Sequence, residues 1–314
     1  HLEPCPLMHA NFRLNVITRS AGRSAVGASA YRSASAVACA AYRAGDRVQD
    51  DRYDKTHDYT NKHNVMHSQI ITPDGAPEWM KDRQQLWNAV EAGEKRKDAR
   101  LAKEVVLVLP RNLTFEQHKA VVEEFVHDNI TKHGLIADYA IHNPDASDGG
   151  KNPHAHIMFT LRPVEGNGFG KKLTGYANVL DSPDLVPQWR NAYEKLLNNA
   201  SEQANSEIRF DMRNYKQKGI DRQPQPKIGP KVTYLEKRGY QTEWGKEVRQ
   251  VIHQNKAKSA QAGHQFYNQV THHISRAVDH VRDDIAHKYY EVMYGAKHAY
   301  EEDNQQHYSG GHER

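Results

Sequence analysis

The chain has 314 residues, with 43 lysines and arginines against 39 acidic residues, a net charge of +4 and a mean hydropathy of −0.88. This length suffices for one domain of roughly 200–240 residues plus an appendage, and no apolar run approaches the ~18 residues that a membrane helix needs. Two cysteines, Cys5 and Cys39, exclude a disulfide framework and a cysteine-based zinc site, while the mild basicity permits a nucleic-acid partner without requiring one.

The first residues precede a natural-looking start. The chain begins at His1, and Met8 is the expected initiator, so residues 1–7 are interpreted as read-through or added sequence. We expect a main domain over residues 8–240 and a polar helical extension over residues 241–314.

The first predicted elements are a strand, a turn and a helix. Phe12, Leu14 and Val16 alternate with polar residues, as in a half-buried strand. A turn at Ser20–Arg23 leads into an Ala/Ser-rich helix that runs to Gly45. This helix carries a near-repeat, Ala28–Ala34 and Cys39–Gly45. Eleven residues return to nearly the same helical face, about 16.5 Å further along the axis.

Strands and helices then alternate to the end of the main domain. The predicted elements are a strand at Met66–Ile71, a helix at Asp82–Leu101, a buried strand at Glu104–Leu109, a helix from the capping box Thr114–Gln117 to about Lys132, strands at Leu135–Ile141 and His154–Phe159, a helix at Pro187–Asn205, a short segment at Glu207–Met212, an extended linker at Gly219–Val232 and a helical tract from Gln241 to about Asp303. The predicted fold is α+β, an antiparallel sheet with helices packed mainly on one side, plus a long C-terminal helical extension.

Three histidines form the most informative pattern. Side chains alternate along a strand, so His154 and His156 share one face. His142 ends the preceding strand, and the polar connection Asn143–Pro153 lets the two strands pair. Twenty histidines make close pairs common by chance, but the strand context and the third histidine favour a metal site with open coordination positions. Imidazole ligands suit Mn²⁺, Co²⁺, Ni²⁺ or Zn²⁺, and Mg²⁺ serves where it is abundant.

A metal site of this kind, a tyrosine and a basic surface together suggest DNA strand transfer. A metal held by neutral imidazoles polarises a phosphodiester oxygen as a Lewis acid. A tyrosine hydroxyl with its ordinary pKa near 10 becomes a nucleophile only when it is positioned and relieved of its proton. Attack on phosphorus would conserve the bond energy in a phosphotyrosine.

Several motifs occur in the order found in one protein family. They are Ile17–Ala25, Ala30–Arg32, Arg43–Arg47, His57–Lys62, Leu86–Glu91, Ala102–Val105 with Leu109–Pro110, Asn152–His156, Asn214–Asp221 and Pro230–Val232. Over about residues 11–240 the chain resembles the MobA/MobL (MobQ-class) plasmid mobilization relaxases.

The resemblance implies a relaxase fold with a histidine-rich (HUH-type) metal site, and metal-dependent nicking and religation at a plasmid transfer origin through a 5′-phosphotyrosine. His142, His154 and His156 fall on the family's metal ligands, and Glu104 falls on an acidic motif beside the site. The implied cofactor is a divalent ion, Mn²⁺ or Mg²⁺ before Co²⁺, Ni²⁺ or Zn²⁺. The implied partners are single-stranded and supercoiled plasmid DNA, accessory mobilization proteins and a secretion-type coupling protein. The implied location is the bacterial cytoplasm, with transfer to a recipient cell alongside the DNA.

Family members typically have one Ala-Tyr-Arg after the Gly-Arg-Ser turn, whereas this chain has two. Counting forward from the turn selects Tyr31, and counting backward from His57–Tyr59 selects Tyr42. If the first strand ends where the site is built, only the nearer tyrosine reaches the metal, so Tyr31 is the preferred nucleophile and Tyr42 is expected to pack on the sheet.

The remaining candidates keep their alternatives. Glu104 either orients a ligand histidine, accepts the tyrosine proton, or merely pairs with Lys103 or Arg100. The candidate phosphate contacts are Arg13, Arg19, Arg23, Arg32, Lys171 and Lys172, although a single residue of this kind is more often just a solvated charge. The alternative function is a non-catalytic DNA-binding relative of a relaxase. A tri-histidine hydrolase or oxygenase on another fold is disfavoured because no HExxH motif or carboxylate triad is present.

Overall fold

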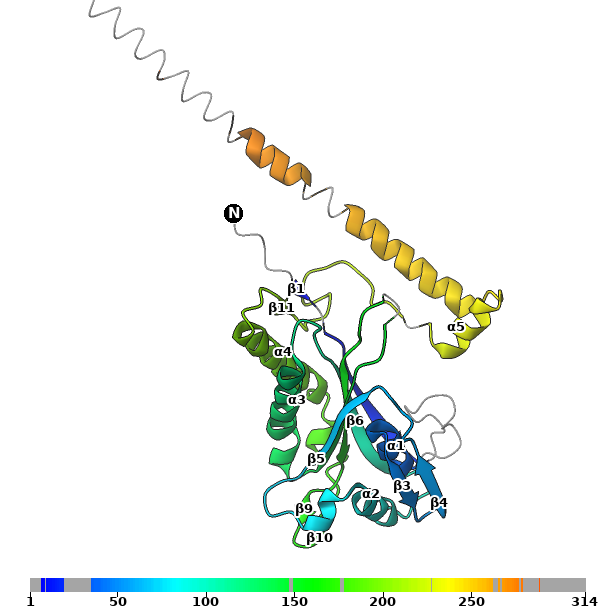
Figure 1. Cartoon of the computed structure of the whole chain (residues 1–314). Coiled ribbons are helices and arrows are strands. Elements are labelled where there is room, and N and C mark those ends of the chain that lie inside the picture. Colours follow the sequence, from blue (N-terminus) through cyan, green and yellow to red (C-terminus); the bar gives the residue numbers. More distant parts are fainter. Residues whose placement is uncertain are drawn as a thin grey trace, which may run out of the picture. The chain divides into compact units, whose positions relative to one another are not determined.

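Five antiparallel strands form the main sheet in the computed structural model, in the order β2-β6-β8-β7-β5 (Figure 1). These strands are β2 (Phe12–Thr18), β5 (Val65–Ile71), β6 (Arg100–Val108), β7 (Ala137–His142) and β8 (His154–Thr160). The α+β class and the antiparallel sheet predicted from the sequence are confirmed.

The structure describes residues 7–8, 10–19, 35–146, 149–175, 178–226, 228–261, 265, 267–276, 278 and 288. The chain divides into two units, His1–Met212 and Arg213–Arg314. Tyr31, Arg23 and Arg32, which the sequence analysis singled out, lie outside the described residues.

One face of the sheet packs against the two longest helices of the first unit. These are α3 (Phe115–Asn129) and α4 (Leu185–Gln203). Alternate residues such as Val105, Leu107 and Ile157 point to this side and are fully buried in its core. The predicted capping box is confirmed, because Thr114 and Gln117 each bond the other's backbone.

The other face carries shorter elements, so helices cover both faces rather than mainly one. They are α1 (Ala36–Ala44) and α2 (Arg83–Ala92), with the hairpin β3 (Arg47–Asp50) and β4 (Lys55–Asp58) beside them (Figure 1). A second buried cluster, which includes Trp87 and Met158, lies beneath them. This cluster does not extend to the end of the face where His142, His154 and His156 lie.

Helix α1 is fixed at both of its ends. Ser35 caps its start and also donates a hydrogen bond to Asp50, whose carboxylate lies 3.4 Å from His57. Gly45 ends it in the left-handed conformation (φ 68°), and a side chain there would press against Val65. The hairpin that holds the start of α1 was not predicted from the sequence.

The predicted helix Asp82–Leu101 is too long, because α2 ends at Ala92. The loop that follows it is held by Arg19, whose guanidinium donates to the carbonyls of Glu94 and Arg96 and pairs with Glu91 at 2.7 Å. A buried arginine that directly follows β2, more than 70 residues earlier in the chain, therefore stabilises a loop where the local sequence favours helix.

Short elements complete the first unit. They are β1 (Leu7–Met8) paired with β11 (Arg209–Phe210), β9 (Val164–Glu165) paired with β10 (Gly168–Phe169), and the 3₁₀ turns η1 (Glu78–Lys81), η2 (Thr131–His133) and η3 (Val179–Asp181).

The second unit contains α5 (Pro230–Lys237) and a helix over residues 243–261. Glu236 pairs with Arg249 at 2.8 Å, and Gln223 exchanges two hydrogen bonds with Asn255. The predicted linker is therefore shorter than expected and partly tied to the helix that follows it. Among the described residues, no helix combines the length and apolarity needed to cross a bilayer.

Candidate metal centre

His142, His154 and His156 converge at one end of the sheet. His142 lies directly opposite His154 on the neighbouring strand, and His156 follows two residues later on the same face. The ring centroids are 4.9–5.4 Å apart, and one nitrogen from each ring lies within 4.8 Å of the others. The cluster predicted from strand alternation is therefore present in the structure.

Each of the three rings has its second nitrogen held by an oxygen that accepts a hydrogen bond. His142 donates from Nε2 to the Arg43 carbonyl (2.6 Å), His154 from Nδ1 to the Asn152 carbonyl (2.7 Å), and His156 from Nδ1 to Glu104 (2.8 Å). A carbonyl or carboxylate only accepts, so the facing nitrogen carries the proton and the other nitrogen presents a lone pair. Metal-binding histidines are oriented in this way, so the donor set fits a divalent ion.

Glu104 is the central buried charge of the site. Its side chain is fully buried; one oxygen accepts from His156 and from Arg43 Nε at 2.5 Å, and the other accepts from Asn15 at 3.1 Å. Burial alone would raise the pKa of Glu104, but the Arg43 guanidinium and the His156 N–H outweigh it and hold that pKa far below its usual range. A carboxylate so stabilised is a weak base, which favours the predicted orienting role over proton acceptance. Its predicted pairing with Lys103 or Arg100 does not occur; both of these side chains pair with Asp181.

His142 and His154 are neutral near pH 7, as ligation requires. Burial lowers the pKa of His142 to about 3, although its hydrogen bond to the Arg43 carbonyl acts in the opposite direction. Burial also lowers the pKa of His154. Protons therefore compete weakly for these two rings.

Tyr42 lies in the last turn of α1, one residue before the carbonyl that holds His142. The Lys62 ammonium sits 3.9 Å from the centre of the Tyr42 ring and donates to the Tyr42 carbonyl at 2.9 Å. Burial and the Arg43 charge lower the pKa of Lys62 to about 8, and the Lys62 charge in turn acts on His142 and His154. Tyr42 is half-buried and also contacts Tyr59 edge-on at 5.3 Å.

The spatial premise for preferring Tyr31 is wrong. Thr18, at the end of β2, pairs with Arg100, whereas His154 pairs with Val108 at the opposite end of β6. Along β6 the end of the first strand is therefore about 26 Å from the level of His154 and about 20 Å from that of His156, at ~3.3 Å per residue. Helix α1 begins near this far end, where the Ala36 N–H donates to Glu91 beside Arg19. It runs back to the histidines, where the Arg43 carbonyl accepts from His142. The choice of Tyr31 as nucleophile itself stays a prediction.

The predicted phosphate contacts fall into different environments. Arg13 is exposed and lies on the same face of the sheet as His156, because both residues pair with Val106 of β6. Its charge contributes to the lowered pKa of His154. Arg19 is instead 9% exposed and forms an ion pair with Glu91, so its charge stabilises the fold and does not face a DNA phosphate. Lys171 is exposed, and Lys172 pairs with Glu94 at 3.0 Å and with the Arg100 carbonyl, far from the histidines.

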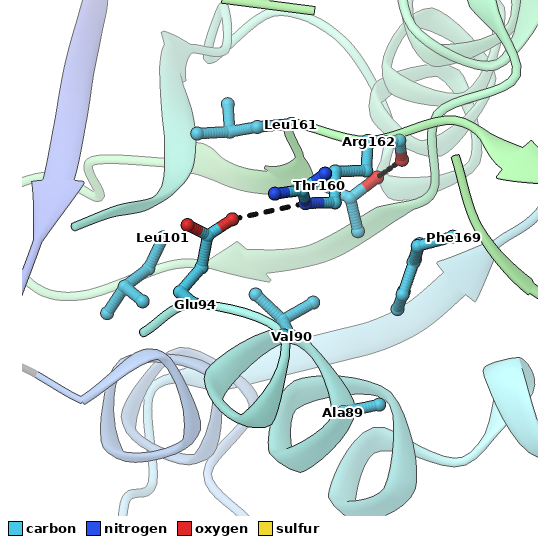
Figure 2. A pocket seen from close by; sticks show the side chains of 9 residues that line it. Ala89, Val90, Glu94, Leu101, Thr160, Leu161, Arg162 and Phe169 are labelled. Atoms are coloured by element: carbon cyan, nitrogen blue, oxygen red, sulfur yellow. Dashed lines mark hydrogen bonds and ion pairs between the residues drawn. The ribbon is translucent and has the colours of Figure 1, made fainter. Parts of the chain in front are cut away.

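A separate pocket of about 220 Å³ lies at this far end, between α2 and the ends of β6 and β8 (Figure 2). Figure 2 shows Arg162 and Glu94 meeting across it, at 3.1 Å. Its charged groups are thus paired with each other, and we assign it no chemistry.

Sequence reasoning missed three members of the site: Arg43, Lys62 and Asn15. Arg43 and Lys62 both lie in the quoted motifs Arg43–Arg47 and His57–Lys62, so the motifs carried a signal for them. Asn15 has no comparable signal, because only the pairing of β2 with β6 brings it opposite Glu104.

The fold and site together define an α+β protein with a tri-histidine centre on one face of an antiparallel sheet. The model of the MobA/MobL family matches residues 34–238, and the chain belongs to this family. The match includes Tyr42 and begins after Tyr31.

Known proteins agree with this assignment. Conjugal transfer protein TraA of Agrobacterium fabrum is 32% identical in an alignment of 247 positions that covers 70% of this chain and 21% of that protein. Mobilization protein MobL of Acidithiobacillus ferridurans is 34% identical in an alignment of 248 positions that covers 71% of this chain and 62% of that protein. The chain thus spans about a fifth of the first relative and three fifths of the second.

A solved structure supports the fold. The structure described as the molecular basis of vancomycin resistance transfer in Staphylococcus aureus aligns with a TM-score of 0.57 and 26% identity, over 66% of this chain and all of that one.

Proposed function

We propose that this chain contains a DNA relaxase domain: a metal-dependent nickase that cleaves and rejoins one DNA strand at a plasmid transfer origin and thereby initiates conjugative mobilization. The observation that carries the proposal is the histidine cluster, in which every ring has one nitrogen fixed by an acceptor and one lone pair left for a metal. Membership of the MobA/MobL family supports the DNA substrate.

His142, His154 and His156 would hold the ion, Mn²⁺ or Mg²⁺ in preference to Co²⁺, Ni²⁺ or Zn²⁺. When bound, a divalent ion supplies Lewis-acid polarisation of the scissile phosphate. Glu104 and the carbonyls of Arg43 and Asn152 keep the three rings aimed at one point.

A tyrosine oxygen would form the new bond to phosphorus while the bond to the 3′ oxygen breaks. The phenol loses its proton, the released 3′ oxygen gains one, and the product is a 5′-phosphotyrosine with a free 3′-hydroxyl. One phosphodiester replaces another, so the reverse attack by the hydroxyl rejoins the strand. Positioning therefore matters more than a chemical driving force.

We favour Tyr42 as the nucleophile. Its backbone neighbour Arg43 contacts a candidate ligand, and the family match includes it. The Lys62 ammonium, 3.9 Å from the centre of its ring, places a positive charge beside this tyrosine. Tyr31 remains the alternative.

DNA would reach this face through its exposed positive charge. Arg13 lies in the same row as His156, and phosphate contacts of this kind supply most of the affinity for DNA. Accessory mobilization proteins and a secretion-type coupling protein are the further partners that this function requires.

The test is a denaturing gel. The protein is incubated with Mn²⁺ and a supercoiled plasmid that carries the DNA flanking its own coding sequence. A DNA band that stays attached to protein in detergent, and that shrinks after proteinase treatment, is the expected result. DNA that is retarded on a native gel but never cut or covalently attached would contradict the proposal and indicate a DNA-binding relative without activity.

A further inference from the structure

We propose that Arg43 is a positioning residue of the metal centre, which fixes two of the three histidines from a single point on α1. It holds His142 through its main-chain carbonyl and His156 through its side chain and Glu104. The inference rests on the proposed metal site, but it concerns a residue that lies outside the ligand set.

The side-chain arm is a buried relay of three groups. The Arg43 side chain is 4% exposed, and its Nε donates to the same Glu104 oxygen that accepts from His156. Arg43 Nη1 donates to the Cys39 carbonyl at 2.7 Å, one turn earlier in α1. The guanidinium is thus fixed to the helix and holds the Glu104 carboxylate in hydrogen-bond contact with the His156 ring.

The main-chain arm uses a general property of helix ends. The last four carbonyls of a helix have no partner within it and concentrate partial negative charge. In α1 the Ala41 carbonyl accepts from Gly45, the Tyr42 carbonyl from Lys62, and the Arg43 carbonyl from His142. A candidate ligand therefore caps the helix that bears Tyr42.

Because of these two arms, the position of α1 on the sheet and the orientation of His142 and His156 depend on each other. Displacement of the Arg43 side chain would release the Glu104 carboxylate and loosen His156. Movement of the helix end would release His142. Because Tyr42 is next to Arg43 in the chain, Arg43 would thereby also fix the position of Tyr42 relative to the metal site.

The arrangement also leaves a buried donor unused. Among the described residues, Arg43 Nη2 has no hydrogen-bond partner. A buried guanidinium nitrogen without a partner lowers stability, so an arginine that served packing alone would be a poor choice here. This observation favours a positioning role over simple core packing.

The test compares Arg43→Met with a matched control, Arg19→Met. Arg19 forms another deeply buried arginine–carboxylate pair, with Glu91, at the far end from the histidines. Binding of Co²⁺ is measured by titration calorimetry on the full chain without DNA, and the visible absorption of bound Co²⁺ reports the ligand geometry. Thermal unfolding in EDTA records the stability of each variant.

We expect both Met variants to lose stability, but only Arg43→Met to weaken Co²⁺ binding, by about 10–100-fold, the usual effect of removing a group that orients a ligand. Arg43→Lys, which keeps the charge beside Glu104, should fall between the wild type and Arg43→Met, and it decides the question if Arg43→Met does not fold. Equal Co²⁺ affinity and an unchanged spectrum in the Arg43 variants would overturn the inference while leaving the proposed function intact. No Co²⁺ binding by the wild type would overturn both.

Discussion

Replacement of Glu104 by glutamine tests how strongly the buried charges of the site depend on one another. Glutamine keeps the size of the side chain and an acceptor for His156, but it removes the negative charge that faces Arg43. Both partners of this pair are almost completely buried, so water cannot take over the role of the carboxylate.

The expected loss is large. Removal of one partner from a buried ion pair costs about 3–5 kcal/mol, because the other charge remains buried without compensation. At roughly 2–4 °C per kcal/mol for a unit of this size, a loss of about 3 kcal/mol lowers the melting temperature by about 6–12 °C.

The assay is denaturant unfolding in EDTA of Glu104→Gln, Arg43→Met and the double variant. Because the double variant buries no lone charge, it should be less destabilised than the sum of the two single variants, by about 1 kcal/mol or more. Glu78→Gln is the control; Glu78 pairs with Lys81 on the surface, and its replacement should change stability by less than about 0.5 kcal/mol. A Glu104→Gln loss as small as that of the control, or strict additivity, would refute the reasoning.

Three further predictions concern pH, catalysis and the domain boundary. His142 takes up a proton near pH 6.5 in the unfolded chain but only near pH 3 in the folded chain. Without metal, this difference lowers the free energy of unfolding by about 1.4 kcal/mol for each unit that the pH drops between 6.5 and 3. Urea titrations at pH 7 and 5 should show this loss reduced by about 2 kcal/mol in His142→Asn; equal losses in the two proteins would disprove the assignment. His156→Ala should abolish nicking yet keep DNA affinity within a few-fold, since phosphate contacts supply that affinity, and cleavage that persists in this variant, or in EDTA, would remove the metal from the account. A fragment that ends at Tyr240 should still form the covalent adduct, although α5 loses its pairing with Arg249; an insoluble or inactive fragment would assign the tail to the catalytic domain.

Local sequence predicted the parts of the site that lie on one strand or on two neighbouring strands. The shared face of His154 and His156 follows from alternation alone, and the short connection after His142 limits how far the third ring can lie from them. The capping box at Thr114 was equally local and was equally correct.

Long-range contacts account for the errors. The end of α2 at Ala92 depends on Arg19, more than 70 residues earlier in the chain. The path of α1 back towards His142 depends on anchors at Glu91 and Asp50, and no local pattern encodes that direction. Counting along the chain therefore placed the end of the first strand beside the histidines, whereas the pairing of β2 with β6 places it at the opposite end of the sheet. The choice between Tyr31 and Tyr42 stays a prediction.

The residue that carries the DNA in the covalent adduct tests the central claim most directly. Trypsin separates the two candidate tyrosines, because Tyr31 lies in the peptide Ser24–Arg32 and Tyr42 in the peptide Ser33–Arg43. After nuclease trimming of the adduct, mass spectrometry should find the residual nucleotides on Ser33–Arg43, and Tyr42→Phe should remove them. Nucleotides on Ser24–Arg32 would transfer the chemistry to Tyr31, and nicked DNA without any tyrosine adduct would contradict strand transfer at this site.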